Sequence, residues 1–234
     1  MDEFVFNNAN NISYFLYAII VILVIWFLSK TMKEFLRKKE IENYCKSQNI
    51  TFSTSLTNIP VATKSFSLFK LGGKNYFETA MTGNKDKIKF YLFDFRCLIS
   101  HGSRNVSTYF YCVCIFTYTK NIFPKFYLFP NYKDEGFYDL ETPNIVNFAD
   151  DTEFCRKFIL QSKQENEVKE YFNQNIRECF LRNHVDGYSY EGYMNYFVVA
   201  KYGCLKLEER LEFFNQSLKL FHEITQESSN LSIS

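Results

Sequence analysis

The sequence predicts an α+β fold: one amino-terminal transmembrane helix, then an antiparallel sheet of about six or seven strands packed with two amphipathic helices. The first observation is an uncharged, mostly apolar run from Ile12 to Leu28. The second is an aromatic content of 19%, with 27 Phe and 17 Tyr, which is typical of β-rich cores. The third is helical spacing of apolar residues in two later segments, from Val168 to Phe180 and from Leu207 to Phe221. Counted together, these elements define the α+β class.

The apolar run is the feature around which the chain is organised. Ile12 to Leu28 holds seventeen residues and no charge. A helix of that length spans about 25 Å, close to the roughly 30 Å hydrocarbon core of a bilayer. A buried core helix normally keeps one polar face, and this run has none. We therefore predict a transmembrane helix over 12–29, in contact with the lipid bilayer, after a short extracytoplasmic tail over 1–11.

Charges on the two sides of the span predict its orientation. Two acidic residues and no basic one precede it, whereas Lys30, Lys33 and Arg37 follow it. Positive charge beside a span marks the cytoplasmic side, so the amino terminus should face out and the rest should lie in the cytoplasm. A cleaved signal peptide would begin with basic residues, which this chain does not. The three basic residues are candidates to bind anionic lipid headgroups. A solvated helix that begins with ordinary topology charges is the preferred explanation for them.

Four further segments follow the span. A basic juxtamembrane helix is predicted over 30–48, a cytosolic α+β domain over 49–225, and a frayed tail over 226–234. Within the domain, one helix is expected from Ser162 to Asn183 and a closing helix from Leu205 to Thr225. Apolar and aromatic runs between turn residues predict strands at Phe66–Leu71, Asn75–Met81, Lys87–Leu98, Val106–Tyr118, Glu153–Gln161, Tyr188–Glu191 and Tyr193–Lys201. Pro124 and Pro130 bracket a short aromatic run, Lys125–Phe129.

Three aromatic segments carry a resemblance to a known family. They are Leu92-Phe93-Asp94-Phe95, the run from Pro124 to Leu128, and the run from Phe154 to Leu160 before a helix. Their order, with a closing helix, resembles a family of uncharacterised bacterial membrane proteins that pair one or two amino-terminal spans with a cytosolic α+β domain. Lys125, inserted between proline and phenylalanine, departs from the family pattern. The resemblance implies a single-pass protein of the cell inner membrane, and it implies no activity, cofactor or site residue.

Composition and motifs disfavour several classes of function. The formal net charge is +1 and no Gly-rich phosphate-binding motif occurs, so we expect neither nucleic acid nor a nucleotide cofactor as a ligand. The lysines at positions 85, 87 and 89 form a small basic patch, best explained as a solvated strand edge. Seven cysteines without a Cys-x-x-Cys pair predict free thiols, as in a reducing cytosol. No metal site is predicted, although Cys112 and Cys114 with a distant histidine remain an open alternative.

Asp94 is the most unusual polar residue in the sequence. It lies between Phe93 and Phe95 in a strand that otherwise reads as core. A buried carboxylate is costly unless it is paired, and Arg96 projects from the same face two residues later. We interpret the two as a structural ion pair at the rim of the sheet. The functional alternative is a general acid or base.

The three histidines offer weaker candidates. His101 lies in a predicted hairpin turn, and no nucleophile-elbow sequence supports a triad of His101, Ser103 and Asp94. His184 follows a helix carboxyl end, where the helix dipole favours it. His222 is expected on the surface of the closing helix. No histidine is assigned a catalytic or metal-binding role.

Two functions from different classes follow from these observations. The first is a membrane-anchored domain on the cytosolic face that binds or scaffolds, with a protein partner and without catalysis. The alternative is a membrane-anchored hydrolase that uses Asp94 with a histidine. A domain that reads lipid at its own bilayer is a third possibility, and it would need a basic concave face.

Overall fold

A computed structural model describes residues 2–56, 65–100, 106–120, 122–131 and 144–231, with the backbone alone at 2–16 and 229–231. The chain divides into two compact units, residues 1–44 and 45–234, which are described separately. The predicted turn at His101 and much of the polar excursion after Pro130 lie outside the described residues.

The first unit is helical. Helix α1 (Asp2–Ser47) runs without a break through both the predicted span and the predicted juxtamembrane helix. Over the described part of the chain, none of the helices combines the length and the apolar character needed to cross a membrane. The side chains of residues 12–16, the start of the predicted span, lie outside the described part. The transmembrane helix is therefore not confirmed.

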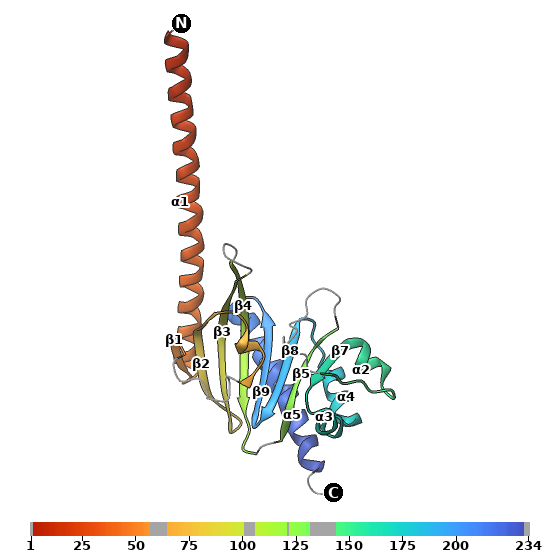
Figure 1. The fold of residues 1–234 in the computed structure, drawn as a ribbon. Coiled ribbons are helices and arrows are strands. Elements are labelled where there is room, and N and C mark those ends of the chain that lie inside the picture. The colour runs from red at the N-terminus through yellow and green to blue at the C-terminus, as the bar shows by residue number, and fades with distance from the viewer. Residues whose placement is uncertain (1, 57–64, 101–105, 121, 132–143, 232–234) are drawn as a thin grey trace. The chain divides into compact units, whose positions relative to one another are not determined.

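The second unit is built on one antiparallel sheet (Figure 1), and the α+β class is confirmed. Its strand order is β1-β2-β3-β4-β9-β8-β5-β7-β6, which is nine strands in the described residues instead of the six or seven expected. Hairpins build the first half of this strand order, because β2, β3 and β4 follow one another in the sequence and pair as antiparallel neighbours. The strands are β1 (Thr51–Ser55), β2 (Lys74–Lys85), β3 (Ile88–Ser100), β4 (Val106–Thr117), β5 (Phe123–Pro130), β6 (Asn144–Ile145), β7 (Phe158–Ser162), β8 (Tyr188–Met194) and β9 (Tyr196–Tyr202).

Both faces of the sheet centre are covered, which explains the nearly continuous apolar sequence of β3. On one face, Phe93 and Phe95 belong to a buried cluster that includes Phe69 of the short helix η2 (Leu68–Lys70). On the other face lies α5 (Leu207–Leu231), where Phe214 packs on Phe90 with ring centroids 4.6 Å apart. A strand buried on both faces loses the polar alternation of a half-exposed strand.

The segment predicted as the first strand is instead helical. Backbone N–H groups of Ser67 and Leu68, at the start of η2, donate to the Glu191 carboxylate at 2.6 and 2.9 Å. Glu191 is buried and lies far away in sequence, on β8. Its carboxylate satisfies N–H groups that a short helix leaves without intrahelical partners. The prediction of a strand over Phe66–Leu71 is therefore wrong.

The predicted strand Glu153–Gln161 begins as a helix. Helix α2 (Thr152–Lys157) precedes β7, and the Asp151 side chain accepts a hydrogen bond from the Phe154 N–H at 3.0 Å. Aspartate is among the most favourable N-cap residues. This cap starts a helical turn where the aromatic residues alone suggested a strand.

The long helix predicted from Ser162 to Asn183 is two helices. Helix α3 (Glu165–Tyr171) ends, and α4 (Gln174–Arg182) begins after the Asn173 side chain, which accepts from the Ile176 N–H at 3.1 Å. The N-cap residue takes non-helical backbone angles, so it interrupts the helix while the apolar spacing continues through it.

The strand β8 and the closing helix are longer than expected, and β9 begins three residues later than the predicted last strand. Gly192 lies inside β8, where a Cβ would meet the Phe126 ring at 2.2 Å, and the turn follows at Met194 and Asn195. Glycine is thus required here by close packing of the ring against the backbone. The closing helix continues to Leu231, beyond the start of the predicted frayed tail.

Candidate functional site

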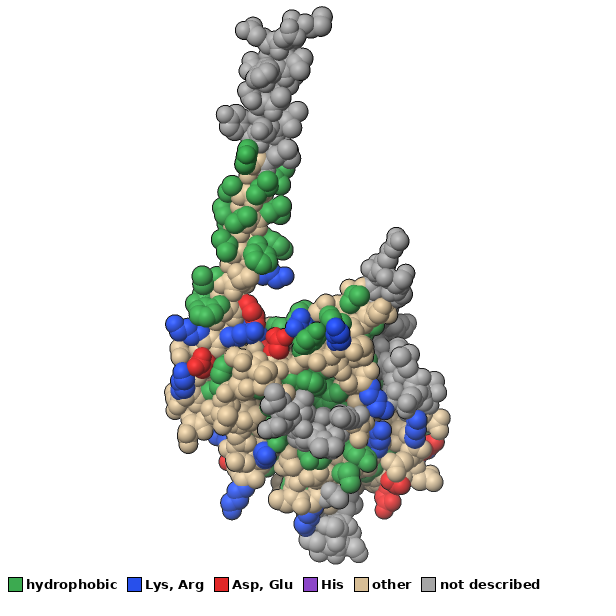
Figure 2. Space-filling view, turned by 60° about the vertical axis from the view of Figure 1, so that its left-hand side comes forward, with side chains coloured by type: hydrophobic (Ala, Val, Ile, Leu, Met, Phe, Trp, Pro, Cys, Tyr) green, Lys and Arg blue, Asp and Glu red, His purple; other side chains and the backbone are tan. Residues whose placement is uncertain are grey.

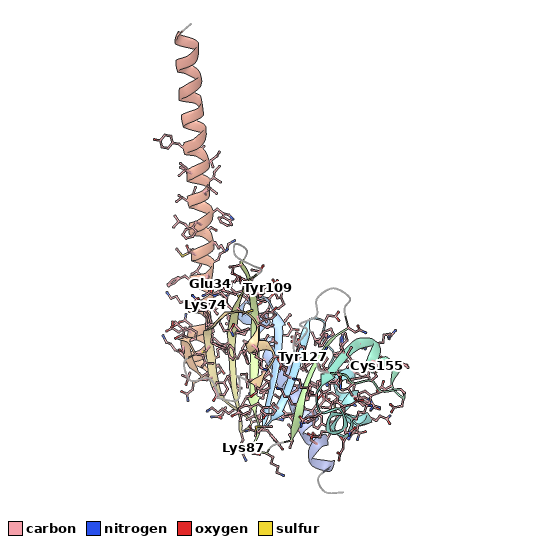
Figure 3. The ribbon with its side chains drawn as sticks, viewed as in Figure 1. Glu34, Lys74, Lys87, Tyr109, Tyr127 and Cys155 are labelled. Atoms are coloured by element: carbon pink, nitrogen blue, oxygen red, sulfur yellow. The ribbon has the colours of Figure 1, made fainter. Side chains whose placement is uncertain are left out.

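A surface hollow of about 430 Å³ lies at one end of the sheet, where three separate parts of the second unit meet. They are the β2–β3 turn, the end of β4 with the residues after it, and the carboxy-terminal half of α5. Figure 3 labels Lys87, which marks this end of the sheet. Polar side chains predominate in the lining, which consists of Asp86, Lys87, Ile88, Thr117, Tyr118, Thr119, His222, Thr225 and Gln226.

The rim of the hollow is a tight turn with an unusual backbone. Lys85 and Ile88 pair across the hairpin, leaving Asp86 and Lys87 as a two-residue turn with φ of 51° and 67°. Two successive positive φ values are typical of a type I′ turn, which strongly favours glycine at its second position. Lysine at this position therefore costs conformational energy. The turn holds the Asp86 carboxyl group against the hollow.

A carboxylate and an imidazole lie beside each other in the lining of the hollow. The His222 Nε2 atom lies 3.6 Å from Asp86 Oδ2, and the side chains are 44% and 61% exposed. His222 was expected on the surface, and it is partly exposed as predicted. The hollow itself was missed because its walls come from about residues 86, 118 and 222. No local sequence motif joins such distant segments.

Asp94 is buried and paired, but its partner differs from the predicted one. Its carboxylate binds Arg210 of α5, whereas Arg96 donates to Glu78 Oε1 at 2.7 Å and stacks on the Tyr76 ring at 4.2 Å. The prediction of an Asp94–Arg96 pair is therefore wrong, and the interpretation of a structural ion pair holds with a different cation.

Arg210 also donates a hydrogen bond to an irregular part of the sheet. The pairing of β2 and β3 shifts between Glu78 and Met81, and Thr79 within this bulge has a φ of 51°. The carbonyl oxygen of Thr79 accepts a hydrogen bond from Arg210 Nη1 at 2.8 Å. Arg210 is fully buried, so it supplies both a buried carbonyl and a buried carboxylate with a donor. These groups stabilise the fold.

The remaining predicted candidates do not assemble into a reactive cluster in the described part of the chain. His184 lies 3.8 Å from Asp186 and packs edge-on against Phe158, and its burial lowers its pKa. Cys112 and Cys114 are buried free thiols, and burial raises the pKa of Cys114 well above its ordinary value. Among the described residues, no group of three His, Cys, Asp or Glu side chains could hold a metal ion.

Comparison with known proteins identifies a fold. No protein-family model and no curated sequence matches the chain. The crystal structure of the mycobacterial trehalose monomycolate transport factor A, TtfA, matches with a TM-score of 0.53 and 9% identity, covering 82% of this chain and 93% of that one. This chain therefore shares an α+β fold with that transport factor. The family resemblance inferred from the aromatic segments gains no sequence match.

Proposed function

We propose that this protein is a membrane-attached component without catalytic activity, which binds or scaffolds other proteins at the bacterial inner membrane. Its amino terminus lies outside and its carboxy-terminal domain lies in the cytoplasm. One observation carries the attachment: every residue from Ile19 to Leu28 is a large apolar one, exposed by 38–64%. Figure 2 shows these apolar side chains along the described part of the helix. A helix that is apolar on all sides needs an apolar environment, which a bilayer over residues 12–28 provides.

The charges after this segment support the proposed orientation and the proposed contact with lipid headgroups. Lys30 lies over the Trp26 ring at 5.6 Å, and Arg37 pairs with Glu34 at 2.9 Å. Because Glu34 offsets the charge of Arg37, we propose that Lys30 and Lys33 bind anionic headgroups more strongly than Arg37 does. Each contributes about 1 kcal/mol near an anionic surface.

Attachment is tested by washing membranes that carry the full chain with alkaline carbonate. The wild type should stay with the membranes, and a double variant with Ile22→Glu and Ile25→Glu should move to the wash, because buried charge is costly. Met32→Glu is the matched control, since Met32 is 57% exposed on the same helix but lies beyond the proposed span. Release of the wild type would contradict attachment. Removal of the domain by protease added outside sealed cells would contradict the orientation.

Among binding functions, the fold favours one that supports transport. The similar structure is described as a transport factor, and the conspicuous buried groups of this chain, Asp94 and Arg210, are engaged with each other. The hydrolase alternative gains no support, because the described histidines His184 and His222 lie beside Asp186 and Asp86. We expect the full chain, purified in mild detergent, to retain an integral membrane protein at a fixed ratio. The Ile22→Glu, Ile25→Glu variant should lose it, and the absence of any such partner from the wild type would contradict the role.

A further inference from the structure

We propose that the hollow between the β2–β3 turn, the end of β4 and α5 binds a polyhydroxylated molecule such as a sugar or sugar headgroup. Nothing in the membrane attachment requires this, so the two proposals succeed or fail separately. The case rests on the chemistry of the lining, on the spacing of Asp86 and His222, and on the two-residue turn that carries Asp86.

The lining combines donors and acceptors with little net charge. Asp86 accepts hydrogen bonds, Gln226 both donates and accepts, and His222 offers a partly exposed ring nitrogen. Sugar hydroxyl groups also donate and accept hydrogen bonds, so these lining side chains can pair with the hydroxyl groups of a sugar. The Asp86 carboxylate would repel a free anion. Lys87 carries one positive charge, which offsets the charge of Asp86 and leaves no excess positive charge to attract an anion. The volume of about 430 Å³ falls within the range of small-molecule sites, about 300–1,000 Å³.

The spacing of the two facing groups suits a bridging hydroxyl group. His222 Nε2 and Asp86 Oδ2 are 3.6 Å apart, which is longer than a direct hydrogen bond of about 2.7–3.2 Å. A hydroxyl group beside both atoms can donate its hydrogen to the carboxylate while its oxygen accepts a hydrogen bond from the Nε2–H of His222. Binding would therefore replace a weak contact with two hydrogen bonds, of which the one to the charged group is the stronger.

The apolar part of the lining fits the carbon face of a sugar ring. Tyr118 is anchored by edge-on packing against Phe221, with ring centroids 6.0 Å apart, and Ile88, also in the lining, is buried. Both lie in or next to ordered strands, so they do not need to be fixed upon binding. The left-handed backbone of Asp86 and Lys87 likewise places the carboxylate before the ligand arrives, which reduces the entropic cost of binding.

Ligand-observed NMR with free trehalose and glucose tests the proposal on the full chain, kept in a detergent whose headgroup is not a sugar. Saturation transfer from the wild type to the sugar protons is expected, with affinity near the millimolar range. Asp86→Asn should weaken binding about tenfold or more, because it removes a hydrogen bond to a charged group. Asparagine tolerates the left-handed backbone, so the turn should persist in this variant.

Controls separate this site from others. Gln174→Ala is the matched control, because Gln174 lies on α4, contacts Glu178 and does not line the hollow. It should bind as the wild type does, and His222→Ala should lose affinity as Asp86→Asn does. No transfer to either sugar with the wild type would overturn the proposal. If Asp86→Asn bound the sugars as tightly as the wild type, the sugar site would lie elsewhere. If inorganic phosphate displaced the sugar, the hollow would be an anion site. Either result would also overturn the proposal.

Discussion

Replacing Arg210 by methionine should destabilise the domain severely, because it removes the partner of a buried charge. Arg210 and Asp94 have side chains exposed by 0% and 6%. Removing one member of a buried ion pair costs about 3–5 kcal/mol. The Thr79 carbonyl loses its hydrogen bond from Arg210 as well, at about 1–3 kcal/mol. The sum is comparable to the whole stability of a typical domain, about 5–15 kcal/mol.

A second substitution distinguishes the lost pair from a damaged core. Adding Asp94→Leu to Arg210→Met removes the uncompensated carboxylate, and replacing both members by apolar residues is often neutral or stabilising. We expect the double variant to recover at least about 2 kcal/mol of the loss, with the Thr79 carbonyl accounting for much of the remainder.

Urea unfolding of the full chain in mild detergent measures both variants. The only tryptophan, Trp26, lies in α1, so the signal should be the near-ultraviolet circular dichroism of the tyrosines. A loss below about 1 kcal/mol for Arg210→Met would refute the reasoning, since a buried unpaired charge cannot be that inexpensive. A double variant as unstable as the single one would show that packing of the Arg210 side chain, not charge, is what matters.

Three further outcomes follow from local geometry. Lys87→Gly should raise the unfolding free energy by about 1 kcal/mol, since glycine adopts its positive φ without strain; a lower urea midpoint would contradict this. Gly192→Ala should lower the melting temperature, because its Cβ would meet the Phe126 ring at 2.2 Å, and Gly73→Ala is the comparison, since nothing lies within 4 Å of its Cβ and its φ is not positive. Burial lowers the pKa of His184, so the unfolded chain binds its proton more readily and stability should fall as pH drops below about 6.5; His184→Gln should flatten that dependence.

The elements that could be predicted from sequence are those determined by neighbouring residues. The hairpin of β3 and β4 follows from aromatic and β-branched strands around one turn, and the apolar stripe of α5 follows from its own spacing. The segment at Phe66 was mispredicted because Glu191 determines its backbone from 124 positions away. The caps Asp151 and Asn173 were visible in the sequence, and weighting them more heavily than the apolar pattern would have corrected α2 and the α3–α4 break.

The same physics explains why the conspicuous residues did not mark the site. Asp94 attracts notice because a charge among apolar residues is costly to bury, and that cost requires a full set of partners, which leaves it unavailable to a ligand. Asp86 and His222 are ordinary in sequence because exposed polar residues cost little, and their exposure leaves hydrogen-bonding capacity for a ligand. In this fold, therefore, a charged residue in an apolar stretch of sequence indicates a structural role. A binding site has to be found from the side chains that the topology brings together.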